Sequence, residues 1–182
     1  MNLRRAVAQI VYIVLASCGV APQPESNKTV AAYEVPLPSQ EDREAFLAIL
    51  RAAATVEGLH VDSARSEDLQ SEAKAIPQAE STLRAGVWRG KDDDESIASA
   101  MDQPDHLRQV WIMFSKGTDP ALNARFQQRA MSQIKERWPS TLSLPIMPTG
   151  AIPLARDLIR TSTGYIVDPK QASRYELKTT SN

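Results

Sequence analysis

The sequence predicts an α+β fold: a two-layer sandwich in which two main helices pack on one face of a mostly antiparallel sheet. Two segments carry apolar residues at helical spacing, and five shorter segments have the composition of strands. With 182 residues, 42% hydrophobic and 24% charged, the chain is large enough for one domain with an ordinary core.

Both helices are marked by start signals. Ser39 is a good N-cap for a helix predicted at about 40–57. Asp119 followed by Pro120 is typical of a second helix start, and the apolar residues that follow recur every four positions. This second helix is predicted at about 120–137.

Strands are expected in the segments between and after the helices, at 59–62, 82–89, 107–115, 142–146 and 164–168. The segment 107–115 is apolar on both faces, which is typical of a central strand. One topology compatible with this order joins 107–115, the second helix and 142–146 in a β-α-β unit. A fold built on that unit would be similar to ferredoxin-like folds.

The densest cluster of charge is Asp92–Glu95. Calcium binding is one interpretation, because this ion prefers several carboxylate oxygens. Counted from Asp92, however, Ile97 and Gln103 stand where an EF-hand loop has its glycine and glutamate. The sequence favours a solvated loop or the first turn of a short helix at 95–101, and it predicts no metal site.

The chain has two histidines, His60 and His106, far apart in sequence, and neither belongs to a zinc motif. Nucleotide-binding glycine motifs and a nucleophile elbow are also missing from the sequence, so no catalytic residue and no cofactor is predicted. One enzymatic alternative remains, a hydrolase of the cell envelope that uses His106 with Asp102 or Asp105.

The charge balance argues against nucleic acid as a partner. Lysine and arginine number 21 against 22 aspartates and glutamates, so there is no excess of positive charge for a phosphate backbone.

Tryptophan and arginine lie close together in two of the predicted strands. If the strands at 82–89 and 107–115 pair, the arginines flank Trp88 and Trp111 on a basic and aromatic contact surface. The alternative, favoured for the tryptophans themselves, is packing in the core. The predicted contact surface consists of Arg84, Trp88, Arg89, Arg108 and Trp111.

The N-terminus has the layout of a signal peptide, because a short basic segment with Arg4 and Arg5 precedes an apolar run from Ala6 to Ala16. As a helix this run would be ~16 Å long, and the hydrocarbon core of a bilayer is ~30 Å thick. We therefore expect it to be a removable signal and not a transmembrane helix.

The end of this run, Leu15-Ala16-Ser17-Cys18-Gly19, resembles the lipobox of bacterial lipoproteins. The resemblance covers only residues 1–19. It implies cleavage between Ser17 and Cys18, a diacylglyceryl group on the Cys18 sulfur and, in most members, a fatty acid such as palmitate on its amine. Several acyl chains would hold the protein firmly on a membrane without spanning it. Because Gly19 and not an aspartate follows the cysteine, the family rule implies the outer membrane, facing the periplasm.

The predicted organisation has four parts. These are a signal peptide at 1–17, a lipidated cysteine with a proline-rich tether at 18–38, a single periplasmic domain at 39–177 and a polar tail at 178–182. We expect the domain to be non-catalytic and to bind a protein of the envelope. Besides the hydrolase, the other alternative to this function is an accessory or immunity lipoprotein of a secretion system.

Overall fold

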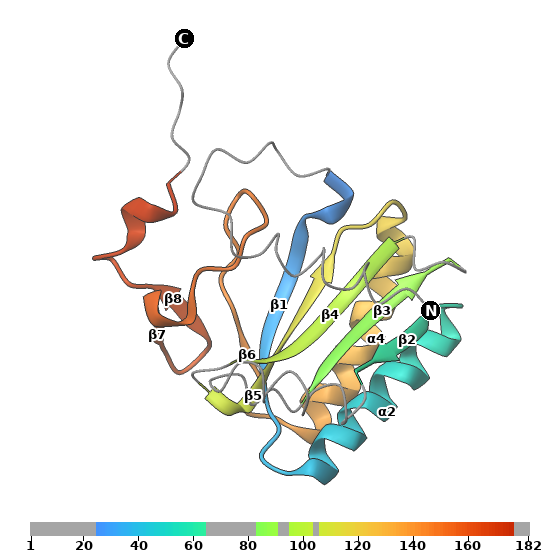
Figure 1. Cartoon of the computed structure of the whole chain (residues 1–182). Helices are drawn as coiled ribbons and strands as arrows, with labels where there is room; N and C mark the ends of the chain where they lie inside the picture. The colour runs from blue at the N-terminus through green and yellow to red at the C-terminus, as the bar shows by residue number, and fades with distance from the viewer. Residues whose placement is uncertain (1–24, 65–82, 91–94, 104–105, 177–182) are drawn as a thin grey trace.

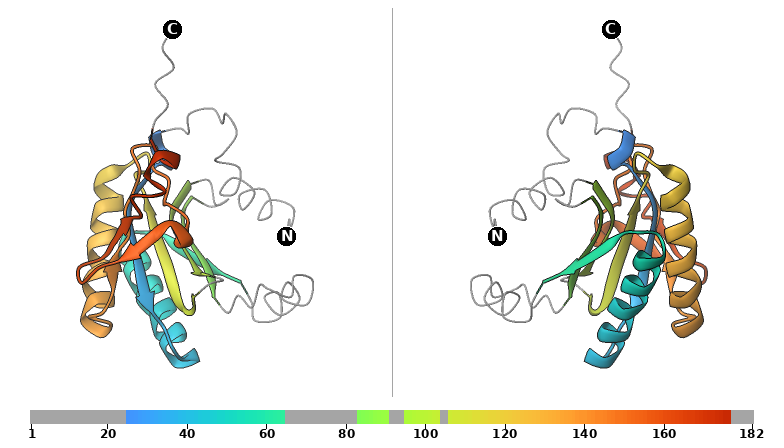
Figure 2. Two further views of the ribbon diagram at one scale, coloured as in Figure 1. Left: turned by 90° about the vertical axis from the view of Figure 1, so that its left-hand side faces the viewer. Right: turned by 90° about the vertical axis from the view of Figure 1, so that its right-hand side faces the viewer.

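A computed structural model describes residues 25–64, 83–90, 95–103 and 106–176, with the backbone alone for 106–108. In this part of the chain a six-stranded sheet, ordered β2-β3-β4-β5-β1-β6, carries the helices α2 and α4 on one face (Figures 1 and 2). Every pair of neighbouring strands in it is antiparallel. The predicted two-layer α+β sandwich is confirmed.

The helices are α2 (Gln40–Val56) and α4 (Pro120–Arg137). The strands of the large sheet are β1 (Thr29–Pro36), β2 (His60–Ser63), β3 (Arg84–Arg89), β4 (Glu95–Gln103), β5 (His106–Ser115) and β6 (Leu142–Ser143). A separate hairpin is formed by β7 (Leu158–Arg160) and β8 (Tyr165–Val167), and the single 3-10 turns are η1 (Glu25–Asn27), η2 (Ala155–Asp157) and η3 (Ala172–Arg174).

Both helices begin where their caps predict. The Ser39 hydroxyl accepts a hydrogen bond from the Asp42 amide at 3.0 Å, and the Asp119 carboxylate accepts one from the Leu122 amide at 3.0 Å. Neither helix combines the length and the apolar character that crossing a bilayer requires, a finding that covers the described residues alone.

The prediction of a tether as far as residue 38 is wrong. Residues 29–36 form β1, an interior strand between β5 and β6. Val35 and Leu37 are 0% exposed in the core. Pro36 stands at the last position of the strand, where a missing N–H is tolerated. The folded domain therefore begins by Glu25, and only residues 19–24 separate it from Cys18.

The short helix considered at 95–101 is also wrong, because these residues belong to β4. Residues 92–94 of the alternative loop lie outside the described residues. Small side chains at Ala98 and Ala100 face the helices, opposite Phe114 and Ile112 of β5. Pairing with β3 on one side and β5 on the other stabilises this segment as a strand despite its weak intrinsic preference.

The β-α-β unit is present in a split form. β5 and β6 both pair with β1 in antiparallel fashion, so they run parallel to each other with β1 between them. The strand predicted at 142–146 is limited to Leu142–Ser143. The one predicted at 164–168 pairs with β7 in the hairpin and meets the large sheet at a single bridge between Gly164 and Ser143.

The main core fills the space between the sheet and the helices. Its largest fully buried side chains include Phe46 of α2, Phe126 of α4 and Phe114 of β5. The rings of Phe114 and Phe126 are 5.9 Å apart between centroids, so the sheet and α4 are in direct contact.

Candidate functional site

The face of the sheet opposite α2 and α4, which we call the second face, carries most of the candidate residues. Figure 1 views the molecule from this side, and Figure 2 shows the helices confined to the other. Strand register and alternation place on this face Ala32, Glu34, His60, Asp62, Arg84, Gly86, Trp88, Ser99, Met101, Gln109, Trp111 and Met113.

Trp88 lies flat against its own strand at this face. A Cβ atom added to Gly86 would lie 2.8 Å from Cε2 of the Trp88 indole, so the ring occupies the space above the glycine. Trp88 is half-buried, and its cross-strand neighbours are His60 on β2 and Ser96 on β4. A tryptophan held in this way offers a flat contact area at little entropy cost.

The structure brings together only part of the predicted contact surface. Arg84 and Trp88 lie four residues apart on β3 and share the second face. Trp111 is on the same face but is only 6% exposed. Arg89, the next residue along β3 after Trp88, points to the opposite face and contacts Thr118 in the turn before α4. The side chain of Arg108 lies outside the described residues.

Trp111 is buried beneath the C-terminal segment, where its indole N–H donates a hydrogen bond to a buried carboxylate. Glu34, 3% exposed, accepts hydrogen bonds from Trp111 Nε1 at 3.3 Å and from the Tyr165 hydroxyl at 2.6 Å. The Gln109 amide, with its nitrogen toward Glu34, donates to both carboxylate oxygens at 2.7 and 2.8 Å. Burial and the bond to Glu34 raise the pKa of Tyr165 to about 12.

These contacts divide the second face into two halves. The C-terminal segment 144–167 covers the half formed by β1 and β5, where Ala32, Trp111 and Leu144 form a small buried cluster. The other half, formed by β2, β3 and β4, carries Trp88 and Arg84. Sequence reasoning missed Glu34 because it assigned that residue to the tether.

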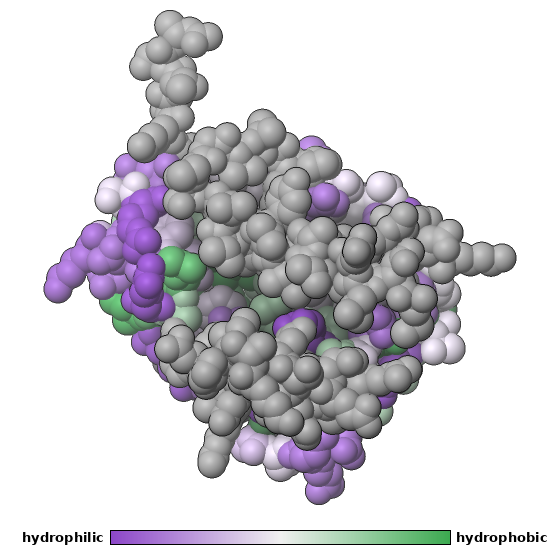
Figure 3. All heavy atoms as spheres, in the orientation of Figure 1, coloured by the Kyte–Doolittle hydropathy of each residue, from purple (hydrophilic) through white to green (hydrophobic). Residues whose placement is uncertain are grey.

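The hairpin that covers the first half is apolar on its outer side as well. Ile159 and Ile166 face each other across β7 and β8, and they are 43% and 50% exposed. In the space-filling view, apolar surface is visible in this region beside hydrophilic residues (Figure 3). A single cross-strand pair of this kind is a small patch.

The carboxylate of the proposed hydrolase is already engaged. Asp102 lies on the helix side of the sheet, and its side chain is 2% exposed. It accepts a bond from Arg43 of α2 at 2.5 Å and one from the Leu83 amide at 2.6 Å. Asp102 therefore stabilises the contact between α2 and β4. The side chain of His106, and Asp105 entirely, lie outside the described residues.

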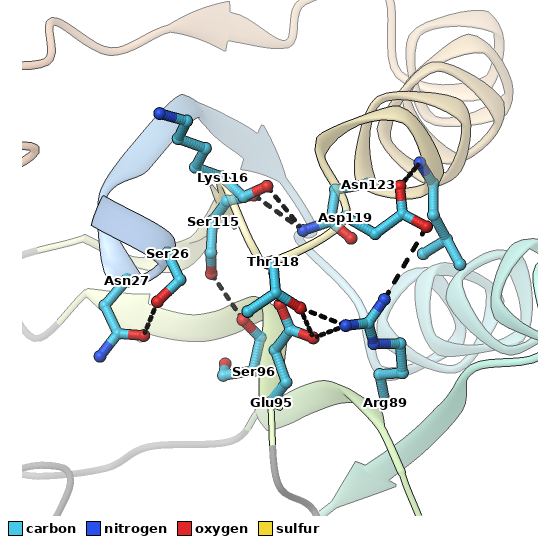
Figure 4. Close-up of polar contacts among 11 residues, drawn as sticks. Ser26, Asn27, Arg89, Glu95, Ser96, Ser115, Lys116, Thr118, Asp119 and Asn123 are labelled. Carbon is cyan, nitrogen blue, oxygen red and sulfur yellow. Dashed lines mark hydrogen bonds and ion pairs between the residues drawn. The ribbon is translucent and has the colours of Figure 1, made fainter. Parts of the chain in front are cut away.

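Arg89 and Glu95 form a network at the start of α4 (Figure 4). The Glu95 carboxylate is paired with Arg89 at 2.6 Å and accepts bonds from the amide and hydroxyl of Thr118. The Asn123 amide donates to the carbonyls of residues 115 and 116. Within the described ranges no group of three metal-binding side chains exists. These groups shape the turn into α4.

A shallow depression of about 420 Å³ lies between α4 and β1. Lys135 is the one charged group of its lining and stands 4.9 Å above the Tyr33 ring. The other side chains of its lining come mainly from α4 and include Gln127, Gln128 and Ser132.

Comparison with known protein families, with curated proteins and with solved structures gave no significant match. Function is therefore inferred from the residues and their geometry.

Proposed function

We propose that this protein is a lipid-anchored protein of the bacterial envelope whose folded domain binds another envelope protein. The observation that carries the proposal is the Leu15–Gly19 motif, which ends an apolar run and stands six residues before a folded domain. An acylated Cys18 would place that domain at a membrane surface, most plainly the outer membrane on its periplasmic side.

Binding is favoured over catalysis by how the buried carboxylates are used. Glu34 accepts bonds from Trp111 and Tyr165, Asp102 pairs with Arg43, and Asp157 is held by Arg174 at 2.9 Å. Each joins two parts of the fold, a structural task that leaves its oxygens occupied.

The binding surface we propose is the half of the second face formed by β2, β3 and β4. Tryptophan and arginine are the side chains most enriched in the energetic centres of protein interfaces. Trp88 and Arg84 supply both on one strand, and Met101 lies beside Arg84 on β4. The predicted partner is a protein for this reason.

The test is a crosslinking pull-down from detergent-solubilised envelopes of the native host, comparing three forms of the protein. The wild type should capture one stoichiometric partner, and Trp88→Ala should reduce capture at least tenfold. Val56→Ala is the matched control, because Val56 is an apolar residue 61% exposed at the end of α2 and away from the second face. Its capture should equal that of the wild type.

Equal capture by Trp88→Ala and the wild type would contradict the assignment of the surface, and no specific partner in any form would contradict the binding function. His106→Ala separates the hydrolase alternative: it should leave capture and biological function unchanged. Loss of function with capture intact would favour the enzyme.

A further inference from the structure

We propose that one end of the domain, where β1 begins, faces the phospholipid headgroups, so that the strands run away from the bilayer. We call this the anchor end, and it consists of residues 25–30, 115–118 and 147–151. The inference rests on the proposed lipidation of Cys18 and adds an orientation to it.

The chain is attached to the fold from η1 onward. The Gly117 amide donates to the Ser26 carbonyl at 2.8 Å, and the Lys116 amide donates to the Lys28 carbonyl at 2.8 Å. Figure 4 shows Ser26 and Asn27 of η1 beside Ser115 and Lys116. The Lys116 ammonium also pairs with Glu25 at 3.2 Å. The folded domain therefore begins at Glu25, and the link to the lipidated cysteine ends there.

Covalent geometry limits how far Glu25 can be from the lipid. Seven Cα–Cα steps separate it from Cys18, and fully extended they span at most ~25 Å. A tether reaching to residue 38 would have allowed the domain to turn in any direction, but β1 removes most of that length.

The opposite end of the domain is much farther from the attachment point. β1 alone, eight residues long, spans ~26 Å from the anchor end to the far end. The far end consists of residues 36–40 and 138–141. A hydrogen bond from Trp138 Nε1 to the Asp42 carboxylate, 3.2 Å long, joins the end of α4 to the start of α2 there. Figure 1 shows η1 and the start of α2 at opposite ends of the sheet.

The anchor end carries charges of both signs. Hydrogen bonds from Lys28 and Lys116 hold the pKa of Glu25 below its ordinary value, so these three groups carry one net positive charge at neutral pH. Around Thr118 at the same end, Arg89, Glu95 and Asp119 add one net negative charge. The end is therefore close to neutral, and the proposed orientation rests on the short link to Cys18 and not on attraction to anionic lipid.

In this orientation the plane of the sheet is perpendicular to the membrane, so a partner would approach the second face from the side. A partner bound there would contact the domain within ~50 Å of the bilayer, the sum of the extended link and the strand length.

The orientation can be measured with single-cysteine variants. Because Cys18 is the only native cysteine and its sulfur carries lipid, an introduced thiol is the one site for a fluorophore. Thr149→Cys marks the anchor end and Ser140→Cys the far end, and both residues are exposed hydroxyl residues in turns. The lipidated proteins are placed in phosphatidylcholine and phosphatidylglycerol vesicles that contain a headgroup quencher.

Quenching should be at least threefold stronger at position 149 than at position 140. A twenty-residue glycine-serine insertion between Pro24 and Glu25 should remove the difference, because it frees the domain from the membrane surface. Equal quenching without the insertion, or stronger quenching at 140, would overturn the orientation.

Flotation of the same vesicles distinguishes the two proposals. Protein that floats and is quenched equally at both positions contradicts the orientation alone. Protein that fails to float, like a Cys18→Ser control, contradicts the lipid anchor itself.

Discussion

The two faces of the six-stranded sheet are covered in different ways. In the described ranges the helix side contains a cluster of twenty buried apolar residues, and the second face contains a cluster of three, Ala32, Trp111 and Leu144. The charged group buried between the sheet and α2, Asp102, is paired with a cation, whereas Glu34 on the second face accepts bonds from neutral donors. The helix side therefore supplies most of the stability, and the second face is held by a few specific bonds.

The largest difference is expected from cavities made on the two sides. Phe126→Ala, at a fully buried position of α4, should lower the free energy of unfolding by ~3–5 kcal/mol in chemical denaturation. Leu144→Ala should cost ~2 kcal/mol, the low end for such a change, because its cluster is small. Equal losses would show that both faces contribute alike.

A second prediction concerns the buried ion pair of the helix side. Asp102→Ala should lower the free energy of unfolding by ~3 kcal/mol, because it leaves the Arg43 guanidinium buried without its carboxylate. The double variant Arg43→Met/Asp102→Leu should recover most of that loss in the same denaturation experiment. A loss no smaller in the double variant would contradict this account of the pair.

The hydrogen bond from Tyr165 to Glu34 on the second face should contribute less to the free energy of unfolding than the buried ion pair does. Tyr165→Phe removes one donor to Glu34 and should cost ~1–2 kcal/mol. The first sign should be faster proteolysis within 158–167, since the hairpin loses its bond to the sheet.

Tyr165 also predicts how stability depends on pH. Its pKa is raised to about 12 from an ordinary value near 10, so the folded state favours the neutral phenol. The stability due to this group is fully present below pH 10 and is lost as the pH rises to 12. Denaturation at several pH values should show a smaller decline in that range for Tyr165→Phe than for the wild type. An identical decline would assign the effect to other groups.

The smallest effect on stability is expected in the half of the second face formed by β2, β3 and β4. Gly86→Ala should cost under ~1 kcal/mol, because the indole that it displaces can move away. It should nevertheless shift tryptophan emission and reduce partner capture. Val56→Ala, at the end of α2 and away from the second face, is the control and should change neither. Unchanged capture by Gly86→Ala would show that the position of the ring is not important for binding.

The parts of the fold that could be predicted are those with local signals. Both helices begin at the predicted caps, Ser39 and Asp119, because capping depends on residues within one turn. β1 and β4 could not be predicted in this way, because both owe their form to pairing on two sides. The partners of β1, β5 and β6, are far away in sequence, and those of β4 are the adjacent strands β3 and β5. The prolines near residue 36 and the acidic residues near 95 obscured what periodicity there was.

The same reasoning explains the outcome for the candidate site. Arg84 and Trp88 could be placed on one surface because alternation within a single strand is enough. The same alternation places Arg89 on the opposite face from Trp88, so the predicted surface could not include both. Glu34 required knowledge that β1 exists and lies beneath the C-terminal segment.

The central claim is that Cys18 carries the lipid and begins the mature protein. Mass spectrometry of the protein from the membrane fraction of its native host tests this directly. We predict an N-terminal peptide that starts at Cys18 and carries a diacylglyceryl group on its sulfur. A protein that retains Met1, or one that starts elsewhere with an unmodified thiol, would contradict the claim.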